Sequence, residues 1–205
     1  MTNMRRVLVW AMVVGCGLTS CGTAVAPAGF ARDQPLRGGS LDATWHDSAA
    51  RCTVVTTFTR ISCRAVIRRL PGGSVRVALL ADEGILLADL TCDGTTTTMT
   101  KVVPDLVSIA PRLGWFVHQS WGEPLTSGQP EWRDGHWRTS APSPLAQGAL
   151  RLYGGDPLLL RLIEAQAVSI LVGDYRPWGP GLLAYHSELS ALGISVTITL
   201  SDPRR

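Results

Sequence analysis

The sequence predicts a mainly β protein, in which a curved antiparallel sheet forms an incomplete, unclosed β-barrel with a short, broken helical lid. Three observations predict this fold class. Apolar and polar residues alternate over much of residues 51–200, short glycine-bearing turns separate the runs, and the period becomes helical in one stretch near the middle. Several runs are apolar on both faces, which suits a sheet curled around an apolar interior better than a flat sheet with one wet face.

The first twenty residues have the order of a secretory signal. Arg5 and Arg6 precede an apolar run at 7–14 that is too short to cross a bilayer as a permanent helix. The stretch Leu18-Thr19-Ser20-Cys21 resembles the lipobox of bacterial lipoproteins, in which the cysteine thiol receives a diacylglycerol and the preceding peptide is removed. This resemblance implies a signal peptide at 1–20 and lipidation at Cys21. The alternative is an ordinary signal peptide that happens to end at a cysteine.

The segment after Cys21 predicts a flexible tether at 21–44, because it is rich in Gly, Ala and Pro and has no apolar period. A single β domain is expected at 45–205. Gly22 stands where many proteobacterial lipoproteins of the inner membrane carry an aspartate. By the same resemblance, the protein is expected at the outer membrane of a Gram-negative bacterium, anchored at the periplasmic face.

The charge of the chain excludes one class of partner. The formal net charge is +3 at pH 7, and it falls to about +1 once Arg5 and Arg6 leave with the signal. No basic stripe interleaved with aromatic residues occurs, so nucleic acid is not expected as a partner.

The first half of the domain predicts a meander of closely spaced strands. Alternating runs lie at 61–68, 75–79, 85–90 and 95–100, and turns lie at 71–73, 81–84 and 92–94. Strands with such short connections form antiparallel hairpins, because parallel strands need a longer crossover.

A helix is expected from Pro104 onward. Its apolar stripe consists of Leu106, Ile109, Ala110, Leu113, Phe116 and Val117. Pro111 should kink this helix or divide it in two, and Gly114 should weaken it further. Trp115 and Trp121 add large rings, so the segment is expected to be weakly held and able to move as a lid. Ordinary core packing is the alternative.

Strands return after a loop at 122–130. The Asp134-Gly135 pair within 131–140 is the strongest hairpin signal in the chain. Further runs lie at 149–153, 158–163, 167–172 and 194–200, which brings the expected total to nine to eleven strands.

This order of elements resembles the LolA/LolB group of outer-membrane lipoprotein carriers. The resemblance lies in the lipobox, the meander through 84–94 with its Asp93-Gly94 turn, the helical segment after a proline, and the later hairpins. The stretch 174–183, Asp-Tyr-Arg-Pro-Trp-Gly-Pro-Gly-Leu-Leu, followed by a final alternating strand, is similar to uncharacterised LolB-like lipoproteins encoded among aryl polyene lipid genes. In the group, an open barrel with a helical lid holds acyl chains of lipoproteins.

The resemblance implies a non-enzymatic, lipid-anchored carrier that accepts acyl chains of lipids or lipoproteins and exchanges them with a periplasmic carrier protein. No cofactor is expected. Inward positions of the central strands and the lid are the candidate ligand-binding residues: Leu79, Ile85, Leu87, Leu113, Phe116 and Val117. A structural accessory lipoprotein with a filled core and no ligand is the alternative. An esterase is the third hypothesis, for which His186 is the best candidate histidine, although a hydrogen-bonded strand histidine explains it more simply and no Gly-x-Ser-x-Gly elbow occurs.

Three cysteines remain after Cys16 and Cys21 are set aside. In an oxidising periplasm an odd number of cysteines usually means one pair and one spare thiol. We predict a disulfide between Cys52 and Cys63, which flank an expected hairpin, although Cys92 could equally be a partner. Cysteine and histidine residues are not clustered at ligand spacing, so no metal site is predicted.

Overall fold

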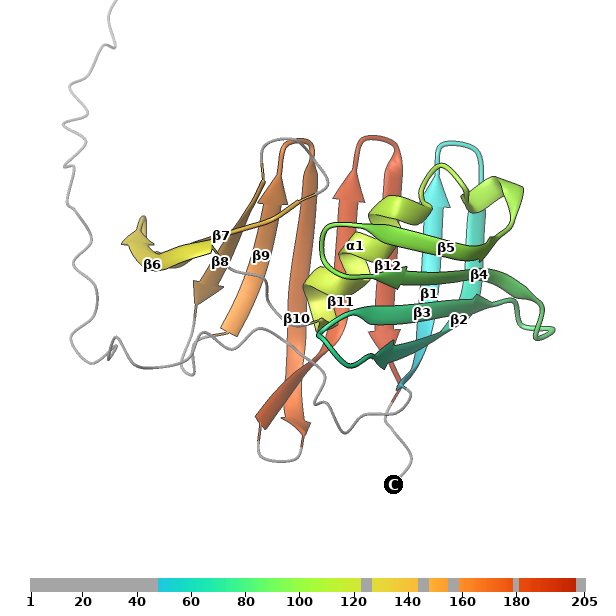
Figure 1. Ribbon diagram of the computed structural model, residues 1–205, viewed down its shortest axis with the longest axis horizontal. Coiled ribbons are helices and arrows are strands. Elements are labelled where there is room, and N and C mark those ends of the chain that lie inside the picture. The colour runs from blue at the N-terminus through green and yellow to red at the C-terminus, as the bar shows by residue number, and fades with distance from the viewer. Residues whose placement is uncertain (1–47, 123–126, 144–147, 155–158, 179–180, 202–205) are drawn as a thin grey trace, which may run out of the picture.

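A computed structural model describes residues 48–122, 127–143, 148–154, 159–178 and 181–201 (Figure 1). The predicted signal peptide, Cys21 and the tether lie outside these residues. The elements, in chain order, are β1 (Ser48–Thr56), β2 (Arg60–Arg69), β3 (Val75–Leu80), β4 (Leu86–Cys92), β5 (Thr97–Val102), the 3₁₀ turn η1 (Pro104–Leu106), α1 (Ala110–Trp121), β6 (Ser127–Arg133), β7 (His136–Ala141), β8 (Ala149–Gly154), β9 (Leu159–Ala165), β10 (Val168–Trp178), β11 (Gly181–Ala191) and β12 (Ile194–Leu200).

The strands of the described residues form one twelve-stranded antiparallel sheet in the order β5-β4-β3-β2-β1-β12-β11-β10-β9-β8-β7-β6. Two meanders, β1–β5 and β6–β12, meet where β1 pairs with β12. The edge strands β5 and β6 do not pair with each other, so the barrel is open. The predicted fold class, mainly β with an incomplete barrel and a helix, is therefore confirmed.

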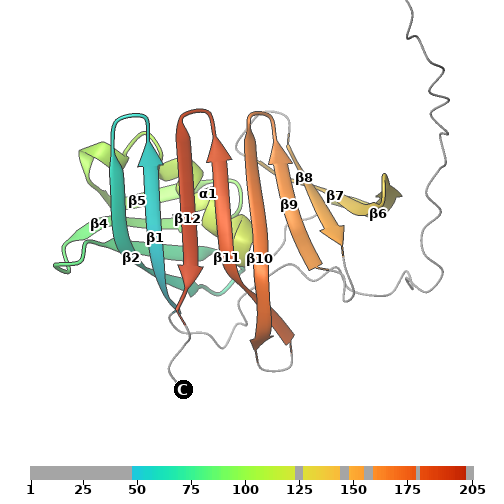
Figure 2. The ribbon, with the colours of Figure 1, turned by 180° about the vertical axis from the view of Figure 1, so that it is seen from behind.

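The sheet bends sharply, so that its first arm folds over the rest. In Figure 1, β3, β4 and β5 run across the direction of β11 and β12, with α1 between the two parts of the sheet. Figure 2 shows the opposite side, where β1, β12, β11 and β10 lie in front of the helix. The helix packs against β3, β4, β5, β10 and β11. It therefore occupies the concave side of the sheet.

Alternating residues of the strands build the core. Val75, Val77 and Leu79 of β3 are buried, and so are Ile170 and Val172 of β10. These faces meet the helix, ten of whose twelve residues are buried. The outer face is less covered than the two-sided apolar runs suggested, since Leu171, between two buried neighbours, is 53% exposed.

Prolines and one side-chain cap set the boundaries of the helical segment and of β5. The segment is divided as predicted, into η1 and α1. Pro111 lies in the first turn of α1, where backbone N–H groups have no partner within the helix, so its lack of an N–H costs no helical hydrogen bond. β5 begins two residues later than expected because Asp93 Oδ1 accepts hydrogen bonds from the backbone N–H groups of Thr95 and Thr96, both at 2.8 Å. That cap keeps these residues in the turn.

The second half of the sheet also differs in part from the expectation. The hairpin at Asp134-Gly135 is confirmed, with both residues at positive φ, as a two-residue hairpin turn requires. β6, however, begins at Ser127, inside the predicted loop. The described residues form twelve strands, above the expected nine to eleven, partly because residues 174–178 and 181–183, for which no strand was predicted, belong to β10 and β11.

Hydrogen bonds hold both ends of α1 to the sheet. Thr97 Oγ1 donates to the Pro111 carbonyl at 3.0 Å, and Trp121 Nε1 donates to the Ala184 carbonyl at 2.9 Å. Ser120 Oγ lies 2.7 Å from Ser187 Oγ. Movement of this helix would therefore have to break specific contacts with the sheet.

Candidate functional site

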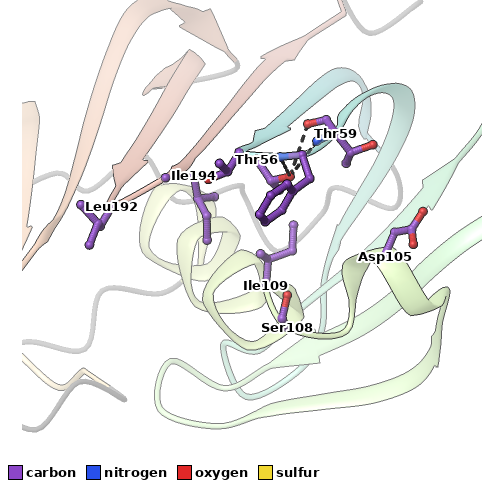
Figure 3. A pocket seen from close by; sticks show the side chains of 10 residues that line it. Thr56, Thr59, Asp105, Ser108, Ile109, Leu192 and Ile194 are labelled. Atoms are coloured by element: carbon purple, nitrogen blue, oxygen red, sulfur yellow. Dashed lines mark hydrogen bonds between the residues drawn. The ribbon is translucent and has the colours of Figure 1, made fainter.

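A pocket of about 490 Å³ opens at one end of the sheet, where two hairpin tips face the start of α1 (Figure 3). The β1–β2 tip, the β11–β12 tip and the segment between η1 and α1 each contribute to its wall. Its lining residues are Thr56, Thr57, Phe58, Thr59, Asp105, Ser108, Ile109, Leu192, Gly193 and Ile194. We call this pocket the tip groove. Its volume lies within the usual range for small-ligand sites.

The two hairpin tips are neighbours because β1 pairs with β12 in a register that sets Thr56 opposite Ile194. Thr56 fixes its own tip, since its Oγ1 accepts hydrogen bonds from the N–H groups of Phe58 at 3.3 Å and Thr59 at 3.1 Å. Gly193 turns the second tip at a φ of +70°, and a Cβ there would lie 2.8 Å from Thr57 Oγ1. The tips are therefore in close contact, although they are far apart in the sequence.

Two large apolar side chains stand almost fully in solvent at these tips. Phe58 is 96% exposed and Leu192 is 93% exposed. Both line the tip groove, and Ile109, which is buried, forms the part of its wall that leads to the core. An apolar rim around an open groove is typical of surfaces that bind apolar ligands or membranes.

The predicted ligand-binding residues do not line the tip groove. Leu79, Leu113, Phe116 and Val117 are fully buried between the helix and the sheet, and Leu87 is partly buried against the same core. The prediction that Ile85 points inward is wrong, because this residue lies in the turn before β4 and its side chain is 61% exposed. The chain reverses at Gly84, which has a φ of +82°, so the strand alternation does not extend back to Ile85.

A polar cluster lies at the other end of the helix, and the sequence analysis missed it. Arg151 on β8 is 1% exposed. Its guanidinium donates three hydrogen bonds to Gln119. Nε and Nη2 both donate to the side-chain Oε1, at 3.2 Å and 2.9 Å, and Nη2 also donates to the backbone carbonyl at 3.1 Å. The signal was present in the strand pattern, because Ala149, Arg151 and Tyr153 share the inward face of β8. An arginine at the middle of an inward triplet is unusual unless the fold supplies partners.

His118 lies next to this cluster and is held neutral. Burial is the main reason that the pKa of His118 falls to about 4, and the positive charge of Arg151 adds to the effect. Neither ring nitrogen makes a hydrogen bond of good geometry, although the Gly73 backbone lies near enough to oppose the fall in pKa in part. Tyr175, whose hydroxyl donates to the Leu160 carbonyl at 2.7 Å, has its pKa raised, chiefly by burial.

The predicted disulfide partners lie side by side. Cys52 and Cys63 are opposite each other in the β1–β2 register, and both are buried free thiols in the structure. A hydrogen bond with Cys63 and burial raise the pKa of the Cys52 thiol. Cys92 pairs in register with Val75 and Thr97 instead, so its position favours the role of the spare thiol. The disulfide remains a prediction.

The candidate catalytic histidine, His186, lies within the described ranges. His186 is partly exposed on β11, and its Nδ1 lies 3.2 Å from Thr199 Oγ1. This contact fits the simpler interpretation, a hydrogen-bonded strand histidine, better than a catalytic role. Asp174 pairs with Arg176 at 2.7 Å, and the hydrogen bond from Arg176 is the main reason that the pKa of Asp174 is lowered. Over residues 48–122 and the later described segments, no group of three or more Cys, His, Asp or Glu side chains could hold a metal ion. Within the same ranges, none of the helices has the length and apolar character that crossing a membrane requires.

Comparisons with known proteins identify relatives by fold and not by sequence. No family model and no curated protein matches the sequence. Among solved structures, a LolA superfamily protein from Nitrosomonas europaea superposes with a TM-score of 0.54 at 7% identity, over 80% of this chain and 87% of that one. An outer membrane lipoprotein-sorting protein domain from Vibrio parahaemolyticus gives 0.46 at 11% identity, over 77% and 84%. A DUF1329 family protein from Desulfovibrio piger gives 0.45 at 10% identity, over 78% and 85%. The open twelve-stranded sheet with its helix on the concave side is therefore similar in fold to the LolA superfamily protein from Nitrosomonas europaea.

Proposed function

We propose that this protein is a lipid-anchored carrier that accepts the acyl chain of a lipid or lipoprotein at the periplasmic face of the outer membrane. The anchor is Cys21, and a periplasmic carrier protein is the expected donor. The observation that carries the proposal is the tip groove, an open pocket with the exposed side chains of Phe58 and Leu192 at its rim. The fold supports it, since the structure that superposes with a TM-score of 0.54 is a LolA superfamily protein.

The acyl chain would first occupy the tip groove and then extend along α1. Ile109 connects the groove to the residues predicted to bind the ligand, of which Leu113, Phe116 and Val117 follow on the same helix. Burying a tail of about fifteen methylenes yields on the order of 10 kcal/mol at about 0.8 kcal/mol each. Leaving the tail in a bilayer yields a similar amount, so small differences in affinity would set the direction of transfer.

A structural accessory lipoprotein is the second candidate, and one observation favours it. Leu79, Leu113 and Phe116 are each at most 1% exposed, so the interior beneath the helix is filled by the protein's own side chains. In this alternative the tip groove would dock a protein partner and no acyl chain would be taken up.

We predict that the double substitution Phe58→Ser and Leu192→Ser weakens binding of a fluorescent fatty acid by about thirtyfold. The reason is that burial of each side chain against a tail contributes on the order of 1 kcal/mol. Binding is measured on the full chain carrying Cys21→Ser, which cannot be acylated and needs no detergent.

The matched control is Leu171→Ser, which removes an exposed apolar side chain from the outer face of β10. It should leave the affinity unchanged. Equal affinities for the wild type and the double variant would show that the tip groove is not the binding site.

A further inference from the structure

Arg151 is a buried cation without a carboxylate partner among the residues that the structure describes. Ion pairs elsewhere in those residues include Arg76 with Asp89, Arg133 and Arg138 with Asp134, and Arg176 with Asp174. Arg151 is instead held by neutral oxygens of Gln119, and its Nη1 has no hydrogen-bond partner. A buried charge that is compensated only in part is costly to a fold, and burial accordingly lowers the pKa of Arg151.

The side chains around Arg151 are also donors without acceptors. The Tyr153 hydroxyl oxygen lies close enough to the guanidinium for a weak hydrogen bond that raises the pKa of Arg151, but its own proton has no acceptor among the described residues. Thr139, directly opposite Arg151 on β7, has an unpartnered buried hydroxyl, and Gln119 Nε2 is unpartnered as well. Buried polar groups normally find partners. Several missing acceptors around one positive charge indicate that an anion belongs there.

We infer that Arg151 Nη1 and the Tyr153 hydroxyl bind the carboxylate of a long-chain fatty acid. The inference rests on the proposed function, which supplies the acyl tail, and it adds the chemistry of the head group. A carboxylate fits because one oxygen can accept from the free Nη1 and the other from Tyr153. A phosphate offers more acceptor oxygens than these two donors satisfy.

The position of the cluster suits such a ligand. Arg151 is bonded to Gln119, which lies ten residues after Ile109 of the tip groove. Ten residues of an α-helix span about 15 Å. An acyl chain spans a similar length, about half of the roughly 30 Å hydrocarbon core of a bilayer. A fatty acid with its carboxylate at Arg151 would therefore extend along α1 to the tip groove. These polar atoms are shielded and Leu113 and Phe116 fill the space along α1, so a bound fatty acid would displace Gln119 from part of its contact with the guanidinium and move those two side chains aside.

Tyr153→Phe is the decisive variant, because it separates binding from stability. The hydroxyl proton has no acceptor among the described residues and its oxygen makes only a weak contact with Arg151, so its removal should change thermal stability little. Binding of palmitate should fall about tenfold, since a hydrogen bond to a charged group is lost. Binding of hexadecanol, which has the same tail and no charge, should change little. Both affinities are measured by displacement of an apolar fluorescent dye from the full chain with Cys21→Ser.

Two controls have matched chemistry. Ser48→Ala removes another buried, unpartnered hydroxyl, on β1, which four strands separate from β8, and it should not alter palmitate binding. Arg151→Met should abolish the preference for palmitate over hexadecanol, whereas Arg161→Met, which removes an exposed arginine from the neighbouring strand β9, should preserve it.

The outcomes separate this inference from the proposed function. If wild type binds palmitate and hexadecanol equally, or if Tyr153→Phe behaves like Ser48→Ala, the carboxylate site is wrong and the acyl carrier stands. If lysophosphatidate is preferred over palmitate in an Arg151-dependent way, the carboxylate assignment is overturned in favour of a phosphate. If no tail-bearing probe binds, both proposals fail.

Discussion

Replacing Gly114 by alanine is expected to destabilise the protein by about 2–3 kcal/mol, through overpacking of α1 against β5. A Cβ at this position would lie 2.4 Å from Thr97 Cγ2 and 2.6 Å from Thr97 Oγ1. Thr97 is β-branched, so it cannot rotate both atoms away. The helix would have to shift and lose the bond from Thr97 Oγ1 to the Pro111 carbonyl. Urea unfolding of the full chain with Cys21→Ser measures the change.

Gly173→Ala is the matched control. No atom lies within 4 Å of a Cβ built at this position on β10, and no unusual φ is needed there. Alanine should leave the free energy of unfolding unchanged or slightly raise it, because it restricts the unfolded chain. Adding Thr97→Gly to Gly114→Ala should relieve the clash, and double-mutant analysis would detect the coupling. If Gly114→Ala were as stable as Gly173→Ala, the close packing of α1 on β5 would be contradicted.

Acidification from pH 6.5 towards pH 4 is expected to remove about 3 kcal/mol of stability through His118 alone. The pKa of His118 is about 4 in the folded protein, against an ordinary value of 6.5. Between these values the unfolded chain takes up a proton that the folded protein excludes, so stability is full above pH 6.5 and falls as the pH drops. The charges that act on His118 are Arg151 and Arg69, which lower its pKa further, and Asp93, which opposes them.

His118→Phe should flatten the dependence of unfolding free energy on pH between 7 and 4.5, because a ring of similar size replaces the titrating one. Asp89 and Asp93 do not contribute to the change in stability over this pH range. The hydrogen bond from Arg76 lowers the pKa of Asp89, and backbone N–H groups lower that of Asp93, so both contributions are lost only at more acidic pH. The control His136→Phe, at an exposed position, should retain the slope. An equal slope in wild type and His118→Phe would contradict the burial of this imidazole.

The fold could be predicted from the sequence where local chemistry determines it. Asp134-Gly135 specified its hairpin because only such pairs adopt positive φ readily, and Pro111 divided the helical segment because it lacks an N–H. The boundary of β5 was less certain, since the Asp93 side chain competes with strand pairing for the backbone of Thr95 and Thr96.

The candidate site could not be predicted, because its parts come together only through non-local pairing. Phe58 and Leu192 become neighbours through the β1–β12 ladder, which joins the two ends of the domain. Arg151 gains its partner Gln119 from a helix 32 residues away. Periodicity placed Leu79 and Phe116 correctly in the interior, but it could not show that the helix fills this interior while the groove lies at the hairpin tips.

Native mass spectrometry of the full chain with Cys21→Ser, purified from a bacterial periplasm without detergent, tests the central claim most directly. Our account predicts a co-purified mass that is lost on denaturation and identified as a fatty acid or another acyl lipid, and reloading when palmitate is added. A single ligand-free mass that takes up neither palmitate nor a diacyl lipid would contradict the carrier function and favour an accessory lipoprotein with a filled core.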